Sequence, residues 1–265
     1  MKQNLVITDA DNTLWDTNAV FTDAQIGLLA VLRAEGYRLG GNEFQKLREL
    51  DSLLVELTGM HEYDFRLLAL AVILHSRGMT VKGATRTAVR DFGRRLESYK
   101  TTVENGVNEF RRRLTEFPPL YANVRSTLRA LREKYGCVLA LVSNGNEARV
   151  NETVDHYKIR RYFDIISTGK KNLETYVKVE HSAKALMRGV PERVVVIGDQ
   201  IDVDIVLGNK IGAITVFKPG GYRPEISAAN PDEVPDYVVD NFSGVLDVFK
   251  VTRARPVLEA KEAYS

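Results

Sequence analysis

The chain has 265 residues, of which 44% are hydrophobic and 27% are charged, a composition typical of globular proteins and unlike that of collagen, mucin-like or wholly disordered chains. The formal net charge of +2 provides no global field that would draw the protein to nucleic acid or to an anionic membrane. The single cysteine, Cys137, excludes an internal disulfide framework and favours a reducing compartment. We therefore expect a cytoplasmic protein without nucleic-acid or membrane partners.

In chain order, a short apolar run at residues 5–8 comes first, and a long block without any strand-like run follows it. Within residues 17–118, apolar side chains recur at spacings of three and four, which is typical of amphipathic helices. These stripes cover residues 44–57, 84–99 and 103–117, with glycines between the periodic segments. The block predicts a bundle of four or five helices that ends at Pro118-Pro119.

Strands and helices alternate in the remainder of the chain. Apolar runs rich in valine and isoleucine occupy residues 138–142, 163–166, 194–197, 213–217 and 237–239. Such runs, without polar alternation, are typical of strands buried on both faces of a parallel sheet. Helical stretches accompany them at residues 122–135, 147–157, 173–188, 202–210 and 244–251. The sequence therefore predicts an α/β fold with a doubly wound parallel sheet.

The helical block interrupts this α/β domain. The first strand needs hydrogen-bonding partners in neighbouring strands, and two sequential domains would leave it unpaired. We therefore expect a Rossmann-like catalytic core of residues 1–16 and 119–255, an inserted all-helical cap of residues 17–118, and a C-terminal tail of residues 256–265.

Polar side chains directly follow the strands of the predicted core, where open α/β sheets bind their ligands. They are Asp9, Asp11, Thr13, Ser143, Asn144, Lys170, Lys171, Asp199 and Asp204. Crowded carboxylates repel one another, and a hard divalent cation such as Mg²⁺ relieves that repulsion. A phosphoryl group would suit the metal, the lysine and the hydroxyl together. This set indicates phosphoryl transfer through an aspartyl phosphate.

The motifs resemble those of the haloacid dehalogenase (HAD) superfamily. Residues 7–14, Ile-Thr-Asp-Ala-Asp-Asn-Thr-Leu, resemble its Asp-x-Asp-x-Thr signature, and residues 141–146 resemble its second motif. Gly198-Asp199 followed by Asp204 fits the form Gly-Asp-x-x-x-x-Asp. The third motif lacks its usual proline. Matching residues 174–176 to relatives favours Lys171 as the motif lysine, with Lys170 as the alternative.

The resemblance implies a helical cap of the first (C1) type and a role for each matched residue. Asp9 corresponds to the nucleophile, and Asp11 to the general acid that then acts as the base. Thr13 would steady the turn that holds them. The phosphoryl group would be bound by Ser143, the Asn144 N–H and Lys171. Mg²⁺ would be held by Asp9, the Asp11 backbone carbonyl and Asp199, with Asp204 in support.

The second aspartate of the first motif distinguishes branches of the superfamily. A halide leaving group needs no proton, whereas an alkoxide does, so Asp11 favours a phosphoester substrate. We expect a Mg²⁺-dependent phosphatase that acts on a small phosphorylated metabolite as a monomer or homodimer. A phosphomutase or phosphotransferase, a 2-haloacid dehalogenase and a non-catalytic binding protein are the alternatives.

Other residues have less defined roles at this stage. His61 and Arg66 are candidate cap contacts to the substrate. Trp15 either packs beneath the cap or lines the entrance to the site. The loop at residues 218–222, Lys-Pro-Gly-Gly-Tyr, is read as a turn at the active edge of the sheet, with a substrate contact as the alternative.

Overall fold

The computed structural model describes residues 4–59, 63–220 and 230–250. The backbone forms two compact units, one of Met1–Asn18 with Pro118–Ser265 and one of Ala19–Phe117. His61 and the tail at residues 256–265 lie outside the described residues. No helix in the described ranges is long and apolar enough to cross a membrane.

The first unit is built on a six-stranded parallel sheet with the strand order β3-β2-β1-β4-β5-β6. Its strands are β1 (Asn4–Thr8), β2 (Cys137–Ser143), β3 (Ile165–Thr168), β4 (Arg193–Gly198), β5 (Ile214–Phe217) and β6 (Tyr237–Val238). Every described pair is parallel. This confirms the predicted doubly wound α/β class. The order reverses direction beside β1, which places the switch point, and hence the expected ligand crevice, at the ends of β1, β2 and β4.

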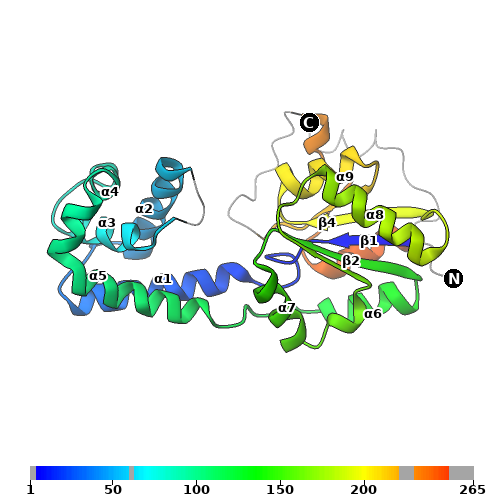
Figure 1. Cartoon of the computed structure of the whole chain (residues 1–265), viewed down its shortest axis with the longest axis horizontal. Helices are drawn as coiled ribbons and strands as arrows, with labels where there is room; N and C mark the ends of the chain where they lie inside the picture. The colour runs from blue at the N-terminus through cyan, green and yellow to red at the C-terminus, as the bar shows by residue number, and fades with distance from the viewer. Residues whose placement is uncertain (1–3, 60–62, 221–229, 251–265) are drawn as a thin grey trace. The chain divides into compact units, whose positions relative to one another are not determined.

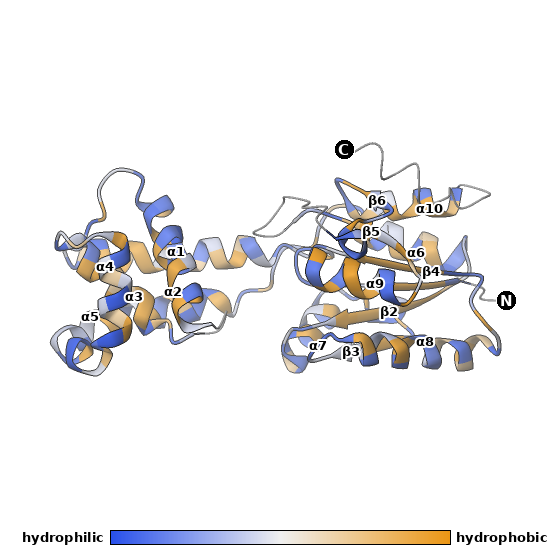
Figure 2. Cartoon of the chain, turned by 90° about the horizontal axis from the view of Figure 1, so that it is seen from above, coloured by the Kyte–Doolittle hydropathy of each residue, from blue (hydrophilic) through white to orange (hydrophobic). Residues whose placement is uncertain are grey.

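Successive residues of each strand point to opposite sides of the sheet. Both sets of residues are apolar here, so both faces of the sheet are apolar. In β1, Val6 belongs to one buried cluster while Leu5 and Ile7 belong to another. Helices α6 (Val124–Glu133) and α7 (Glu147–His156) pack in the first cluster. Helices α8 (Leu173–Met187) and α9 (Val206–Lys210) supply residues to the second. Figure 1 shows these helices on the two sides of the sheet, and Figure 2 shows the strands coloured as hydrophobic.

Several expected elements differ from the structure in their bounds or helix type. The third strand occupies Ile165–Thr168 rather than residues 163–166, because Asp164 instead uses its carboxylate to accept a hydrogen bond from the backbone N–H of Leu139. The segment expected as one helix at 202–210 begins as a wide π-helical turn, η2 (Ile201–Ile205), before α9. The last expected helix is a 3₁₀ helix, η4 (Phe242–Leu246), followed by a single turn, α10 (Asp247–Lys250).

The second unit consists of helices around one apolar core. They are α1 (Thr17–Ala34), α2 (Glu43–Thr58), α3 (Arg66–Ser76), α4 (Val81–Arg90) and α5 (Phe92–Leu114). All seven residues from Leu68 to Leu74 of α3 are buried, so α3 is the central helix of this bundle. The apolar spacing had indicated this helical content correctly.

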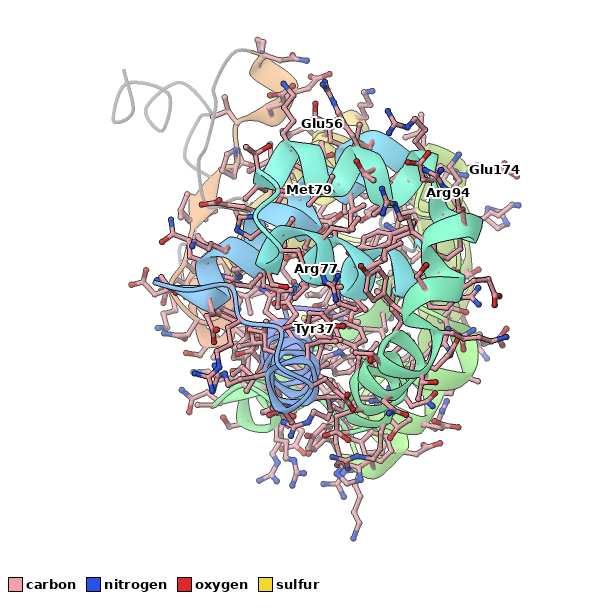
Figure 3. The ribbon with its side chains drawn as sticks, turned by 90° about the vertical axis from the view of Figure 1, so that its left-hand side faces the viewer. Tyr37, Glu56, Arg77, Met79, Arg94 and Glu174 are labelled. Atoms are coloured by element: carbon pink, nitrogen blue, oxygen red, sulfur yellow. The ribbon has the colours of Figure 1, made fainter. Side chains whose placement is uncertain are left out.

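The apolar stripe at residues 84–99 spans two helices rather than one. The chain leaves helical geometry at Asp91 between α4 and α5, and α5 itself is kinked at Tyr99, where φ is −130° and ψ is 16°. The Arg77 guanidinium lies 5.0 Å from the Tyr99 ring centre and 5.7 Å from that of Tyr37. Both distances are within the range of a cation–π contact. Figure 3 labels Arg77 and Tyr37. The apolar spacing did not reveal the break at Asp91, because the apolar residues before and after it pack against the same core.

Candidate active site

Asp9 is the first residue beyond β1, and the sheet fixes its backbone. Its N–H donates to the carbonyl of Ile197 in β4 at 2.9 Å, which extends the β1–β4 ladder by one residue. The chain then turns sharply, with the N–H groups of Thr13 and Leu14 donating to the carbonyl of Ala10. Asn12 within this turn adopts a left-handed φ of 55°, a conformation that asparagine tolerates better than most residues.

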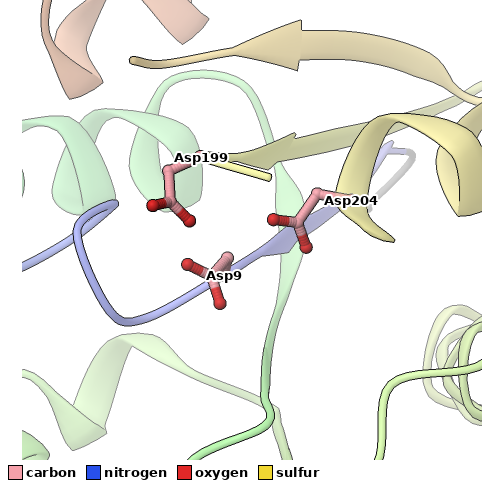
Figure 4. A group of neighbouring side chains, drawn as sticks. All are labelled: Asp9, Asp199 and Asp204. Atoms are coloured by element: carbon pink, nitrogen blue, oxygen red, sulfur yellow. The ribbon is translucent and has the colours of Figure 1, made fainter. Parts of the chain in front are cut away.

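Three buried carboxyl groups converge at the end of the sheet. Asp9, Asp199 and Asp204 each offer an oxygen atom, and these atoms lie within 4.8 Å of one another (Figure 4). The side chain of Asp204 passes so close to the backbone that a Cβ on Gly198 would lie 2.2 Å from it. The glycine of the Gly-Asp-x-x-x-x-Asp motif is therefore required by the close approach of that motif's second aspartate, Asp204.

Lys171 places an ammonium group among these carboxylates. Its Nζ contacts Oδ1 of Asp9 and lies 2.8 Å from Oδ1 of Asp204, and the side chain is almost fully buried. Lys170 is exposed. The loop is held by Asn144, whose Oδ1 accepts a hydrogen bond from the Lys171 backbone N–H at 2.7 Å.

Burial and mutual repulsion dominate the electrostatics of this cluster. Burial raises the pKa of Asp9 to about 7 against the opposing effect of Lys171, and the carboxylates of Asp204 and Asp11 add to the rise. Burial and then the charge of Asp9 raise the pKa of Asp199 to about 8. Burial disfavours the Lys171 ammonium, but the carboxylates of Asp204 and Asp9 more than offset it, so its pKa lies well above the usual value. The cluster has an excess of negative charge that a further cation would relieve.

The Asp11 side chain lies apart from that carboxylate cluster and is held by two donors. The Trp15 indole N–H donates to its Oδ1 at 2.9 Å, and the Thr17 hydroxyl donates to the same oxygen at 2.5 Å. Its Oδ2 lies 3.5 Å from the Ser143 hydroxyl. One oxygen of Asp11 is thus anchored, and the other is turned toward the end of β2.

The remaining predicted residues follow β1 and β2. The Ser143 hydroxyl accepts a hydrogen bond from the Gly145 N–H at 2.9 Å, which fixes the loop after β2. The Asn144 side chain is exposed apart from its contact with the Lys171 segment. Thr13 is fully buried, and its hydroxyl has no hydrogen-bond partner among the described residues. Among the described residues, the turn at Thr13 is therefore held by the backbone hydrogen bonds to the carbonyl of Ala10 rather than by the Thr13 hydroxyl.

Several residues that support the site were not singled out from the sequence. The Tyr176 hydroxyl donates to Oδ1 of Asp204 at 3.1 Å, and the Gln200 N–H donates to its Oδ2 at 3.2 Å. Tyr176 lies one helical turn into α8, where it was available as a buried aromatic residue near the motif lysine. Thr17 had no distinguishing signal, because its contact with Asp11 depends on the turn between them.

Comparison with known proteins agrees with this architecture. A family model of haloacid dehalogenase-like hydrolases matches residues 3–212, and the chain belongs to this family of enzymes. It is 26% identical over 254 residues to a glyceraldehyde 3-phosphate phosphatase from Methanopyrus kandleri, with 92% of this chain and 96% of the relative covered. The predicted membership is thus confirmed, and the phosphatase relative supports an enzyme of the phosphatase branch.

Solved structures with similar folds cover nearly the whole chain. A haloacid dehalogenase-like hydrolase from Xanthomonas campestris has a TM-score of 0.60 at 20% identity, with 98% of this chain and 99% of that chain covered. A predicted phosphoglycolate phosphatase from Haemophilus somnus has a TM-score of 0.56 at 18% identity, with 94% of this chain and 99% of that chain covered. These similarities support the fold.

Proposed function

We propose that the chain is a Mg²⁺-dependent phosphohydrolase that cleaves small phosphate monoesters through an aspartyl-phosphate intermediate on Asp9. The observation that carries the proposal is the state of the two Asp9 oxygens. Oδ1 contacts the Lys171 ammonium, whereas Oδ2 is buried without a hydrogen-bond partner among the described residues. A buried carboxylate oxygen of this kind needs a partner, and a phosphoryl group or a cation beside Asp199 would supply one.

The donor set suits magnesium. Carboxylate and carbonyl oxygens are the ligands that this hard ion prefers, and the Asp9, Asp199 and Asp204 oxygens cluster within 4.8 Å. Both oxygens of Asp204 already accept hydrogen bonds. We therefore assign the ion to Asp9, Asp199 and the Asp11 backbone carbonyl, with Asp204 positioning the lysine. When bound, Mg²⁺ would offset the charge of the phosphoryl oxygens and orient them.

The first half-reaction uses the carboxylate of Asp9 as nucleophile. An Asp9 oxygen attacks phosphorus, the bond from phosphorus to the ester oxygen breaks, and a phospho-aspartate forms. Asp11 donates its proton to the departing alkoxide, which leaves as the alcohol. Lys171 neutralises charge near Asp9, while the Ser143 hydroxyl and the Asn144 N–H bind the phosphoryl oxygens.

The second half-reaction regenerates the enzyme. Asp11, now ionised, removes a proton from water, and the water oxygen attacks phosphorus. The bond between phosphorus and the Asp9 oxygen then breaks, and inorganic phosphate is released. The donors on Asp11, from Trp15 and Thr17, hold one carboxyl oxygen in place, so the same group can serve in both steps without a change of position.

We also propose that residues 17–118 act as the inserted cap and restrict the substrate to small molecules. A cap that closes over the site excludes water and reads the leaving group. Glyceraldehyde 3-phosphate, the substrate named for the relative from Methanopyrus kandleri, is the first compound to test. A phosphopeptide offered at the same concentration should not be hydrolysed. Equal turnover of the phosphopeptide would contradict the cap assignment.

Phosphate release from a panel of phosphorylated metabolites tests the reaction directly. We expect release with Mg²⁺, loss with chelator, and loss in the Asp9→Asn variant. The matched control is Asp202→Asn, since Asp202 is an exposed aspartate of η2, shortly after β4, and it should retain activity. Activity that survives either the chelator or Asp9→Asn would refute the mechanism. Transfer of the phosphoryl group within a sugar phosphate, without release, would identify a mutase instead.

A further inference from the structure

A buried lysine that follows strand β5 contacts the turn that carries the Asp-x-Asp-x-Thr motif. Lys218 directly follows β5 and is 3% exposed. Its Nζ donates to the backbone carbonyl of Asn12 at 2.8 Å, although the two residues are 206 positions apart in the chain. Because a buried ammonium loses its hydration, so specific a contact calls for an explanation.

The surroundings of this ammonium hold it in place. Nζ lies 3.8 Å from the centre of the Tyr121 ring, a close cation–π contact. Burial lowers the pKa of Lys218, and the carboxylates of Asp199, Asp16 and Asp9 act in the opposite direction. The ammonium is therefore directed to the turn and the ring, in contrast to Lys171, which contacts two carboxylates of the cluster.

The backbone two residues further on presses against the same carbonyl. A Cβ built on Gly220 would lie 2.4 Å from the Asn12 carbonyl oxygen, so this approach requires a glycine. The side-chain amide of Asn18 donates a hydrogen bond to the backbone carbonyl of Gly220 at 2.7 Å. This bond connects residues 218–220 to the start of α1. Together, Lys218 and Gly220 bracket the Asn12 carbonyl.

Asn12 connects this bracket to the acidic cluster. Its left-handed backbone sits between Asp11 and Thr13. Its side-chain Oδ1 accepts a hydrogen bond from the Asn18 N–H at 3.1 Å, and its polar side chain opposes the rise in the pKa of Asp199 that burial causes. A displacement of Asn12 would therefore move the turn that holds Asp11 and change the polar surroundings of Asp199.

We propose that Lys218 is a positioning residue that, through the Asn12 carbonyl and with Gly220, fixes the first-motif turn relative to Asp199. The inference rests on the proposed function, because it assigns the residue to the same Mg²⁺ and phosphoryl site. Lys218 acts on the reaction through Asn12 rather than by contact with substrate. Mutation of a group that orients metal ligands typically lowers metal affinity or activity by about 10- to 100-fold.

The test compares Mg²⁺ binding and kinetics in Lys218→Met with wild type. Methionine keeps much of the side-chain volume but removes the donor to Asn12. We expect the apparent Kd for Mg²⁺, measured by calorimetry without substrate, to rise about 10- to 100-fold. We expect kcat to fall by a similar factor with little change in KM for the substrate. A matched control is Val248→Ala, a buried residue of α10, which should lower thermal stability without altering Mg²⁺ affinity.

Gly220→Ala provides a second, independent perturbation if Lys218→Met fails to fold. It keeps the ammonium but forces the Asn12 carbonyl away, so it should weaken Mg²⁺ binding in the same direction. Wild-type Mg²⁺ affinity and kcat in the folded variants would overturn the positioning role while leaving the phosphatase assignment intact. A loss of thermal stability alone, as in Val248→Ala, would also overturn it. Absence of both Mg²⁺ binding and phosphate release in the wild type would instead overturn the proposed function, and the positioning role with it.

Discussion

Replacing Lys171 by methionine should destabilise the folded protein in a pH-dependent manner. The side chain is buried, contacts Asp9 and lies 2.8 Å from an oxygen of Asp204, so its removal leaves neighbouring carboxylates without their cation. Breaking a buried ion pair in this way costs about 3–5 kcal/mol. At about 2–4 °C per kcal/mol for a protein of this size, the melting temperature should fall by about 6–20 °C.

The sign of the pH dependence follows from the raised pKa of Asp9, which is about 7 in the folded protein against about 3.9 in an unfolded chain. Between these values the folded state binds more protons than the unfolded state, so unfolding free energy falls as pH rises through that window. Loss of the Lys171 charge raises the pKa of Asp9 further and extends the window upward. The destabilisation in Lys171→Met should therefore be larger at about pH 8 than at about pH 5.5.

Urea unfolding of metal-free protein at these two pH values provides the assay. The matched control is Lys170→Met, which removes the same functional group from an exposed neighbouring position and should have a much smaller effect. A loss in Lys171→Met no larger than that in Lys170→Met would refute the structural reasoning. A loss that is greater at the lower pH would refute the electrostatic part of it.

Two further predictions concern the acidic cluster. The increase in melting temperature on adding Mg²⁺ should grow from about pH 6 to about pH 8.5, because carboxyl ligands must lose their protons to bind the ion. The pKa values of Asp9 and Asp199 are raised to about 7 and about 8. Thermal scans across that pH range measure the increase, and an increase that does not change with pH would contradict the prediction. Gly198→Ala should destabilise the protein by about 1–3 kcal/mol, because the added methyl group clashes with Asp204. The control is Gly189→Ala, which should have no such effect because a Cβ at Gly189 has no atom within 4 Å. Equal denaturation midpoints for the two variants would count against the close approach of Asp204 to Gly198.

The class of the fold could be predicted because it depends on regularities that survive without tertiary information. Valine- and isoleucine-rich runs such as that ending at Ser143 mark strands buried on both faces, and apolar spacing of three and four marks helices. Boundaries were less predictable. Asp164 became a partner of the Leu139 backbone, and the stripe through residues 84–99 continued across the break at Asp91. Each of these outcomes depends on contacts that are distant in sequence or on backbone angles.

The convergence of the three carboxylates in the candidate site could be predicted from the sequence, but the contacts around them only in part. The ordered motifs identified Asp9, Asp199 and Asp204 as neighbours, since the carboxyl ends of parallel strands meet at one edge of a sheet. Spacing alone left Lys170 and Lys171 as alternatives. The structure buries Lys171 between two carboxylates and leaves Lys170 in solvent, a difference that depends on the path of the loop after β3 rather than on residue type.

The sequence by itself determined the α/β class, the interruption by a helical block and the set of carboxylates, hydroxyl and lysine that follow the strands. Tertiary structure decided which groups hold that set in place. Trp15 anchors Asp11, and Lys218 reaches the turn at Asn12 from a strand that lies far away in the chain. The physical reason is that hydrogen bonds and ion pairs are satisfied only where folding brings donors and acceptors within about 3 Å, and no local pattern specifies partners at that range.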